Sequence, residues 1–360
     1  MHIHAKPETR AVQTKPHLAE PIPVPLAVRP SHSNSAVIST ATLKKHGCFT
    51  TLQARRAKHM SFCHEALSMS MKDWTTHIGD HRAYIFPATR NEVSGNWVAL
   101  VMPEAIPFRL GLMTYAAHLI FLHEDIEQAS ITGEADTKLD SKIVDGLAAA
   151  LPTVPGAETN QTASLSLDRL LNPLIKALMS TDRHTATEIV AVWRKHFATP
   201  DSTAAETVTS FNTYIESRVH TASTEAWLAM LRYSLGLHLS ASSLEVVPHI
   251  TVAAMKSVTL TTDYWSWTKQ SRSPSNNVRA MNAVPFAMAE LGIGETEARE
   301  HVKKMALEAE MEFSKLKKAF GGAANGKEDT EIATYLDAVE AFAAGHSLWC
   351  STCPRYHGLV

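Results

Sequence analysis

The sequence has few cysteines and no long apolar run, and both shortages narrow the kinds of protein that it can encode. Four cysteines in 360 residues are too few for a disulfide framework, and no charged-then-apolar signal opens the chain. These features predict an intracellular, reducing location, and we expect the cytoplasm. A membrane-spanning helix needs roughly 18 or more apolar residues, but Arg109, His118 and His123 interrupt the longest candidate. We therefore expect no membrane span.

The sequence also lacks an excess of charge of either sign. Its 34 lysines and arginines nearly balance its 36 aspartates and glutamates, for a formal net charge of -2. Nucleic-acid-binding surfaces gather basic side chains, commonly with aromatic residues between them, and no stretch of this sequence has that pattern. We therefore expect no nucleic-acid partner. The hydrophobic content of 45% is enough for one large core or two ordinary cores at this length.

Strand-like alternation is scarce, and two other kinds of segment are present. The stretch "KPHLAEPIPVPLAVRPSHSNS" alternates proline with small residues, which removes backbone donors and leaves no periodic apolar face. Residues 1–40 are therefore predicted to be a flexible tail. From Ala41 onward apolar residues recur every three or four positions, as is typical of helices. The predicted helices cover residues 107–128, 165–197, 204–238, 244–270, 277–292, 294–319 and 328–349.

Short polar stretches separate these helical segments. They are "TPDST" at 199–203, "SRSPSNN" at 271–277 and "GGAANGKED" at 321–329, with a longer stretch at 153–164. Their glycine, proline and small polar residues are typical of turns and loops. Because no internal repeat is present, the sequence predicts one all-α domain over residues 41–360. The oligomeric state stays open.

Three carboxylates close an otherwise apolar helix in "FLHEDIEQAS", residues 121–130. One stripe of this helix contains Met113, Ala117, Ile120, Glu124 and Glu127, and the adjoining stripe contains Phe121, Asp125 and Gln128. The carboxylates therefore continue buried stripes. Either the helix end emerges into water here, or the carboxylates hold a metal together with a second cluster that faces them.

A candidate for that second cluster lies in "TLTTDYWSWTKQ", residues 259–270. Thr262, Ser266 and Gln270 are four residues apart, so their oxygen-bearing side chains share one helical stripe. Such oxygens suit a hard cation such as Mg²⁺. The alternative is that the hydroxyls bond back to the preceding helical turn.

Cations and donors accompany the two clusters. Arg218 lies in "YIESRVHTASTEAW", Lys269 lies inside the second cluster, and Arg355 and Tyr356 lie in "CPRYHGLV" at the chain end. A single buried arginine is commonly an ion-pair partner. Several such donors beside two magnesium-type clusters would instead hold a diphosphate, because arginine forks match phosphate oxygens and lysine acts as a point charge.

Taken in order, these segments resemble the motifs of the fungal class I terpene synthases, especially cyclase domains of the fusicoccadiene and ophiobolin type. "FLHEDIEQ" is similar to the aspartate-rich motif, "TDYWSWTKQ" to the Asn-Asp-x-x-Ser-x-x-x-Glu motif, "YIESR" to the segment with the diphosphate-sensing arginine, and "RY" at 355–356 to the terminal Arg-Tyr pair. "NAVPFAMAELGIGETEA" at 282–298 also follows the second motif as in that family. The resemblance implies a class I terpenoid synthase helical bundle around a central apolar cavity.

The sequence departs from the family pattern at several positions. Glu124 replaces the first aspartate and Gln128 the distal acid, unless Glu127 serves one residue early. In the second motif Thr262 replaces the asparagine and Gln270 the glutamate, while Ser266 matches. Thr221 replaces the aspartate expected after Arg218. The chain therefore resembles a divergent member or a former enzyme, and the retained diphosphate donors favour an active one.

The resemblance implies Mg²⁺-assisted ionisation of a prenyl diphosphate, followed by cyclisation of the allylic cation in an aromatic-lined pocket. The implied metal ligands are Glu124, Asp125, Gln128, Thr262, Ser266 and Gln270. The implied diphosphate donors are Arg218, Lys269, Arg355 and Tyr356. The implied pocket residues are Phe121, Trp265 and Trp349, although aromatic residues of helical bundles are commonly ordinary core. A ligand such as Asp125 on a cavity wall would make few packing contacts, so its replacement by Ala should abolish product and leave the melting temperature nearly unchanged.

For the substrate, we expect farnesyl diphosphate and a sesquiterpene hydrocarbon product such as a medium-ring, humulene-like olefin. A chain without a fused elongating domain would draw its substrate from the common cellular pool. Cyclisation of a C20 or C25 prenyl diphosphate to a diterpene or sesterterpene is the alternative.

Three rival interpretations stay open. His346, Cys350, Cys353 and His357 have spacings that a zinc site can use. A chain-elongating prenyltransferase would share the helical fold, but its second aspartate-rich motif is absent from the sequence. A non-catalytic helical protein that binds isoprenoids would retain the pocket without the reaction.

Overall fold

A computed structural model describes residues 32–79, 91, 93–132, 137–151, 167–198, 208–220, 222–271, 281–321 and 327–357. The first helices are α1 (Thr40–Lys45), α2 (Met60–His77), α3 (Trp97–Val101), α4 (Pro107–Thr132), α5 (Thr137–Ala150), α6 (Leu167–Thr181), α7 (Arg183–Ala198) and α8 (Phe211–Val219). They are followed by α9 (Ala222–Leu235), α10 (Ala241–Val246), α11 (Pro248–Gln270), α12 (Ala283–Leu291), α13 (Glu295–Gly321), α14 (Lys327–Cys350) and α15 (Pro354–His357). Two short strands, β1 (Ser35–Val37) and β2 (Arg55–Ala57), form an antiparallel pair. In the described residues the fold is thus nearly all helical, as the sequence predicted.

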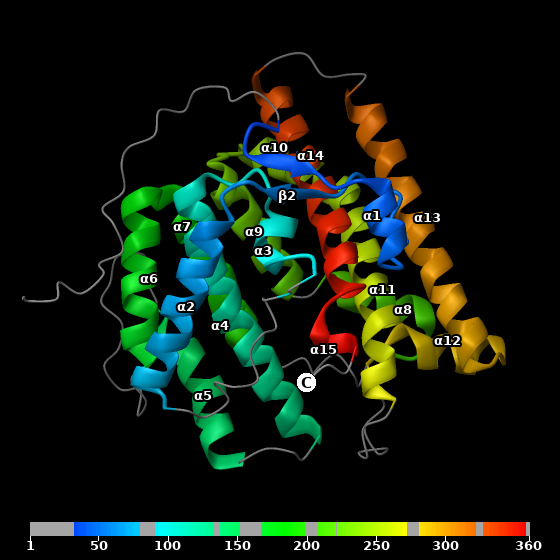
Figure 1. Cartoon of the computed structure of the whole chain (residues 1–360), viewed down its shortest axis with the longest axis horizontal. Coiled ribbons are helices and arrows are strands. Elements are labelled where there is room, and N and C mark those ends of the chain that lie inside the picture. The colour runs from blue at the N-terminus through cyan, green and yellow to red at the C-terminus, as the bar shows by residue number, and fades with distance from the viewer. Residues whose placement is uncertain are drawn as a thin grey trace, which may run out of the picture.

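The long helices pack as neighbours around a common core (Figure 1). Helix α2 packs along α4, α7 along α9, and α11 contacts both α13 and α14. The two-stranded sheet lies across one end of the bundle, and the short helix α15 lies towards the opposite end, between α4 and α11 (Figure 1). This arrangement brings the C-terminal halves of α4 and α11, which contain the two oxygen-rich motifs, to the same end of the molecule.

Three of the predicted helices are divided in the structure, and the one predicted over 204–238 becomes α8 and α9, with His220 as the C-cap of α8. The segment predicted over 165–197 divides at Asp182, whose carboxylate accepts a hydrogen bond from the backbone N–H of Thr185 at 3.3 Å and so caps α7. The same carboxylate accepts from Arg109 Nη1 at 3.0 Å. The segment predicted over 244–270 divides before Pro248, which is the first residue of α11. Apolar periodicity continues across the breaks at Asp182 and Pro248 because the flanking helices face the same core.

The predicted tail boundary at residue 40 differs from the structure. Ser35, which was placed in the tail, pairs with Ala57 in the two-stranded sheet, and its hydroxyl accepts a hydrogen bond from Arg55 Nε at 2.6 Å. The backbone N–H of Asn34 donates to Glu104 at 3.1 Å. These partners are distant in sequence, so local composition could not reveal them. The predicted breaks at 153–164 and 199–203 lie outside the described residues.

A buried carboxylate on α13 fixes the segment that follows α1. Glu310, which is 0% exposed, accepts hydrogen bonds from Thr50 Oγ1 at 2.6 Å and from Thr51 N and Oγ1 at 2.7 Å. The ring of Phe49 then packs against Tyr264 and Trp265 on α11, with ring centroids 5.2 and 6.3 Å away. The N-terminal segment is thereby held against the helix that contains the second motif.

Replacing Glu310 by Gln tests this anchor. Hydrogen bonds to a charged group contribute about 1.5–3 kcal/mol, and an amide NH₂ would face donors. We therefore expect the free energy of unfolding, measured by urea denaturation, to fall by about 1.5–3 kcal/mol. The exposed neighbour Glu312, which lies 3.9 Å from Lys315, is the control. Glu312→Gln should change the free energy of unfolding by less than about 1 kcal/mol. Equal effects of the two substitutions would contradict the anchor.

Among the described residues, no helix combines the length and the apolar content that a membrane crossing requires.

Candidate active site

Asp125 on α4 and Arg355 on α15 are 230 residues apart in the chain and form a two-contact ion pair. Arg355 Nη1 donates to Asp125 Oδ2 at 2.8 Å, and Nη2 contacts Oδ1. The two side chains are only 9% and 14% exposed. The guanidinium also lies over the ring of Phe121, one helical turn before Asp125, at 5.7 Å from the ring centroid. A predicted metal ligand, a predicted diphosphate donor and a predicted pocket residue therefore meet at one place.

The charges around this pair stabilise the guanidinium. Burial opposes the charge of Arg355, but the neighbouring Asp125 and Glu124 carboxylates contribute to a net rise of its pKa above the usual value. Burial also raises the pKa of the adjacent Tyr356 phenol well above its usual range. Arg355 is thus a permanent cation and Tyr356 a permanent hydroxyl donor at ordinary pH. Both are suited to binding an anion.

Helix α15 is held in place by the two helices beside it. His357 Nε2 donates to the carbonyl of Cys350 at the end of α14, at 3.1 Å. The His357 ring also packs against Trp265 of α11, with centroids 5.2 Å apart. The Arg355–Tyr356 pair is therefore fixed between α4 and α11 (Figure 1).

In the second motif, one amide bridges two of the three predicted ligands. Asn282 Nδ2 lies 2.9 Å from Gln270 Oε1 and 3.3 Å from Ser266 Oγ. Asn282 is the N-cap of α12 and had no role in the sequence interpretation. Its place before a helical run is a common capping signal, but nothing in the sequence indicates that its NH₂ group reaches back to α11.

Thr262, the third predicted ligand of this motif, belongs to a different hydrogen-bond chain. Trp97 Nε1 donates to His346 Nδ1 at 3.1 Å. The proton of His346 is therefore on Nε2, which donates to Thr262 Oγ1 at 2.8 Å. Thr262 Oγ1 donates in turn to the carbonyl of Val258 at 3.0 Å. Burial lowers the pKa of His346 to about 4, so the imidazole is neutral. Thr262 thus back-bonds to the preceding turn, as in the alternative interpretation of this stripe.

Arg218 lies beside Asp263, the acidic residue inside the second motif. Asp263 is buried and accepts hydrogen bonds from the Tyr214 hydroxyl at 2.7 Å and from the backbone N–H of Ala283 at 2.9 Å. Burial raises the pKa of Asp263 to about 6, against the opposing effect of the Arg218 charge. Asp263 therefore joins α8, α11 and α12. Lys269 is exposed near the end of α11.

A group of buried aromatic rings lies where α3, α4, α9 and α14 meet. Trp97 lies 5.1 Å from Phe121 and 4.8 Å from Trp227 between ring centroids, and Phe121 lies 6.0 Å from Trp349. With Phe342, 5.7 Å from Trp97, these rings make the central aromatic cluster. The rings of this cluster pack against one another largely edge to face. The sequence interpretation identified Phe121 and Trp349 but missed Trp97 and Trp227.

Trp265 lies outside the central aromatic cluster. Its ring contacts Tyr264 and the N-terminal Phe49, in addition to His357. The sequence interpretation placed Trp265 in the substrate pocket. In the structure it packs against α15 and the N-terminal segment.

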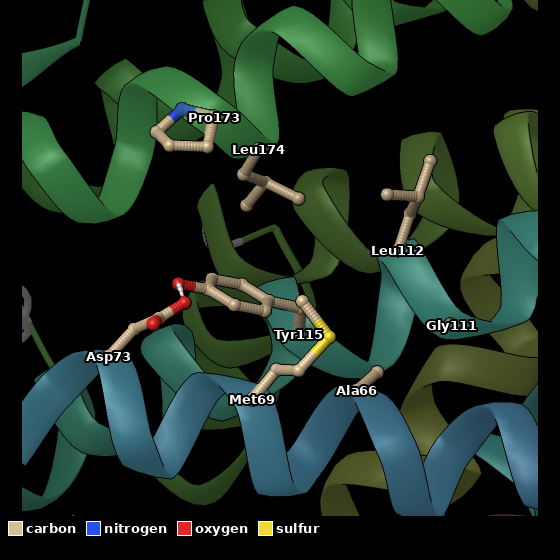
Figure 2. Close-up of a pocket in the computed structure, with 8 residues that line it drawn as sticks. All are labelled: Ala66, Met69, Asp73, Gly111, Leu112, Tyr115, Pro173 and Leu174. Carbon is tan, nitrogen blue, oxygen red and sulfur yellow. Dashed lines mark hydrogen bonds between the residues drawn. The ribbon is translucent and has the colours of Figure 1, made fainter. Parts of the chain in front are cut away.

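A small cavity of about 30 Å³ lies between α2, α4 and α6 (Figure 2). The Tyr115 hydroxyl at its edge donates to Asp73 Oδ2 at 3.1 Å, and Met69 and Leu174 cover its sides. A space of this size holds about two water molecules. It also lies ten residues from Asp125 along α4, or about 15 Å. It is too small and too distant to be the prenyl site.

The terminal histidines and cysteines do not form a zinc site in the part of the chain that the structure describes. His346 Nε2 lies 3.2 Å from Cys350 Sγ but bonds to Thr262, and His357 bonds to a backbone carbonyl. Burial raises the pKa of Cys353 to about 12 and that of Cys350 well above its usual value. Zinc binds thiolates, so it would have to displace the protons of both thiols and the hydrogen bonds of both histidines.

The oxygen donors fit Mg²⁺ in chemistry. Asp125, Ser266 and Gln270 present oxygens to positive or hydrogen-bond-donating groups, and Mg²⁺ binds through few carboxylates and other oxygen ligands together with substrate phosphates. Among the described residues, no group of three or more His, Cys, Asp or Glu side chains is assembled for a metal. The side chain of the predicted ligand Gln128, like that of Glu127, lies outside the described residues.

A family model described as terpene synthase family 2, C-terminal metal binding, matches residues 116–312. This range is more than half of the chain and contains both oxygen-rich motifs. The chain belongs to terpene synthase family 2. Class I enzymes of this family use Mg²⁺, so the fit of the donors and the family agree on the metal.

Curated relatives and solved structures agree with this assignment. The sesterterpene synthase btcA of Colletotrichum orbiculare is 26% identical over 314 residues, which are 86% of this chain and 44% of that protein. The bifunctional type I diterpene synthase tndC of Aspergillus flavipes is 25% identical over 339 residues, 90% of this chain and 41% of that protein. The terpene synthase chain therefore spans less than half the length of these relatives.

Among solved structures, aristolochene synthase from Penicillium roqueforti matches with a TM-score of 0.61 and 16% identity, covering 81% of this chain and 94% of that chain. Germacradien-4-ol synthase from Streptomyces citricolor matches with a TM-score of 0.63 and 16% identity, covering 84% and 97%. The predicted class I terpenoid synthase fold and the resemblance to fungal terpene synthases are confirmed.

Proposed function

We propose that this chain cyclises a prenyl diphosphate in an Mg²⁺-dependent reaction. The observation that carries the proposal is the meeting of Asp125 and Arg355. An acid of the first motif and the arginine of the terminal pair are 230 residues apart in the chain, and a magnesium–diphosphate complex needs both kinds of group side by side. The guanidinium of Arg355 lies over the aromatic ring of Phe121.

The residues divide into two sets with different tasks. Glu124, Asp125, Ser266 and Gln270 would hold the metal, which when bound neutralises negative charge on the leaving diphosphate. Gln128 and Thr262 are further proposed ligands, and Thr262 would have to use the lone pair that its bond from His346 leaves over. The diphosphate would accept hydrogen bonds from Arg218, Lys269, Arg355 and Tyr356.

The central aromatic cluster would receive the hydrocarbon. The faces of Trp97, Phe121, Trp227 and Trp349 carry negative charge density that stabilises a nearby cation. Their burial also excludes water, which would otherwise capture the cation. For the prenyl chain to enter, these rings would have to move apart.

For the substrate, we propose farnesyl diphosphate and a sesquiterpene hydrocarbon product, such as a humulene-like olefin. The support is the bulk of the buried rings beside Phe121, which favours a shorter prenyl chain. A C20 or C25 diphosphate is the second candidate, because curated relatives carry the names diterpene synthase and sesterterpene synthase.

Competition among substrates tests the proposal. The purified chain is incubated with Mg²⁺ and equal concentrations of the C15, C20 and C25 prenyl diphosphates, and volatile products and released diphosphate are measured. We expect the C15 compound to be consumed first and its product to disappear when the metal is chelated. Preference for a longer diphosphate would overturn the farnesyl assignment. Binding of all three without turnover would favour a non-catalytic isoprenoid-binding protein.

A further inference from the structure

The side-chain amide of Asn282 is fixed at both ends by backbone groups. Its Oδ1 accepts a hydrogen bond from the N–H of Val284 at 2.9 Å, and its Nδ2 donates to the carbonyl of Asp263 at 3.0 Å. A backbone N–H only donates and a carbonyl only accepts, so these two partners determine which end of the amide is which. The Asn282 side chain is fully buried. Its orientation is therefore unambiguous.

The remaining hydrogen of this amide is directed at the second motif. Nδ2 is 2.9 Å from Gln270 Oε1 and 3.3 Å from Ser266 Oγ. Because Nδ2 offers only hydrogens, Gln270 has to present its oxygen and not its own NH₂ group. The shorter distance gives Gln270 the stronger of the two hydrogen bonds.

This orientation matters because glutamine is an ambiguous metal ligand. Its amide oxygen can coordinate a hard cation, whereas its NH₂ group cannot. A glutamate at position 270 would offer two equivalent oxygens, whichever way it rotated. An amide oxygen has two lone pairs, so Gln270 can accept from Asn282 and retain one lone pair for a metal.

We propose that Asn282 is a positioning residue that keeps the Gln270 and Ser266 oxygens available to Mg²⁺. It would thereby let a neutral glutamine serve where the family pattern has a glutamate. The inference rests on the proposed function, since it assumes that these oxygens face a magnesium–diphosphate complex. The competing explanation is that Asn282 only ties the start of α12 to α11 through the Asp263 carbonyl.

A double-mutant cycle separates the two explanations. Asn282→Ser keeps a good N-cap for α12 but removes the NH₂ group, and it is made both in the natural chain and together with Gln270→Glu. The melting temperature is followed at fixed Mg²⁺ while inorganic diphosphate is added, and the half-maximal diphosphate concentration is recorded. In the natural background we expect this concentration to rise about tenfold or more, the usual effect of losing a group that orients a metal ligand. In the Gln270→Glu background we expect less than about a threefold rise, because a carboxylate needs no orienting donor.

Asn96 provides a matched control. It is the N-cap of α3, is 2% exposed and accepts from the N–H of Val98 at 2.9 Å, like Asn282 in its own helix. Its Nδ2, however, has no hydrogen-bond partner within the described part of the chain. Asn96→Ser therefore changes a cap without changing a ligand contact, and it should leave the half-maximal diphosphate concentration unchanged.

Asn282→Thr, which also caps a helix, replaces Asn282→Ser if that variant does not fold.

Each outcome decides the matter. Similar rises in both backgrounds, or no rise in either, would overturn the positioning role while leaving the proposed function intact. If Mg²⁺ and diphosphate do not stabilise even the natural chain, the proposed function fails, and this inference fails with it. The inference is supported if Asn282→Ser raises the half-maximal diphosphate concentration strongly in the natural chain and only slightly in Gln270→Glu.

Discussion

Replacing Asp125 by Asn is expected to lower turnover on the order of 10³-fold. Asparagine keeps the shape of the side chain but removes the charge that would hold the metal and balance Arg355. Metal-based charge stabilisation supplies several kcal/mol to such reactions, and about 4 kcal/mol corresponds to a factor of 10³. Product formation from the preferred prenyl diphosphate at saturating Mg²⁺ measures the loss.

The stability of this variant should also change, contrary to the expectation drawn from the sequence. In the structure Asp125 contacts the little-exposed Arg355 twice, so its replacement leaves a guanidinium with a weakened partner. We expect the free energy of unfolding to fall by about 1–3 kcal/mol. Asp145→Asn, at an exposed position on α5, is the control for both measurements and should change neither. A variant at position 125 that retains more than about a tenth of the turnover would exclude Asp125 as a primary ligand.

Replacing Arg355 by Ala is expected to lower kcat/KM. The corresponding loss of transition-state stabilisation should be about 2–4 kcal/mol, the scale of a lost donor to a developing negative charge. Arg355→Lys should lie between this variant and the natural chain, because lysine keeps the charge but loses the two-pronged contact with Asp125. Steady-state kinetics with the same prenyl diphosphate give both values.

A second arginine in a comparable setting serves as the control for Arg355. Arg232 on α9 lies 3.3 Å from Glu188 and packs over the ring of Tyr335 at 5.8 Å, but it does not belong to the proposed site. Arg232→Lys should leave kcat/KM nearly unchanged. If instead the purified chain contains one zinc per molecule and Cys350→Ser releases it, the terminal segment is a zinc site. Arg355 would then not be a diphosphate donor.

The sequence predicts helices well where one apolar stripe faces one core. The spans predicted for α4, α13 and α14 agree with the structure to within a few residues. Periodicity does not reveal a break such as that at Asp182, because its cause is a carboxylate that caps α7 and binds a distant arginine. Likewise, β1 forms within a segment of low helical and strand signal because Ser35 finds partners around residue 55.

The sequence predicted several residues of the candidate site, but it did not predict which of them contact one another. The residues Asp125 and Arg355 could be named from motifs, yet their ion pair depends on how α15 packs between α4 and α11. The sequence assigned no role to Asn282. The direction of its NH₂ group is set by contacts with the backbone of Val284 and Asp263, which the sequence does not reveal. Trp97 and Trp227 had no motif to mark them, because an aromatic side chain looks the same in a core and in a substrate pocket.

The central claim is that the two sets of oxygens become a magnesium site only when a diphosphate arrives. In the structure Asp125 is neutralised by Arg355, and Ser266 and Gln270 accept from Asn282. Glutamine in place of glutamate also removes one negative charge from the site. Asp125, Arg355, Ser266 and Gln270 together carry no net charge, so the charge of the diphosphate is needed to attract the metal.

Titration calorimetry with Mg²⁺, in the absence and presence of inorganic diphosphate, tests this claim most directly. We expect little binding of Mg²⁺ to the chain alone and clear binding once diphosphate is present, with a lower Mg²⁺ requirement in Gln270→Glu because that variant restores a carboxylate. Tight Mg²⁺ binding without diphosphate, or an unchanged requirement in Gln270→Glu, would contradict the account.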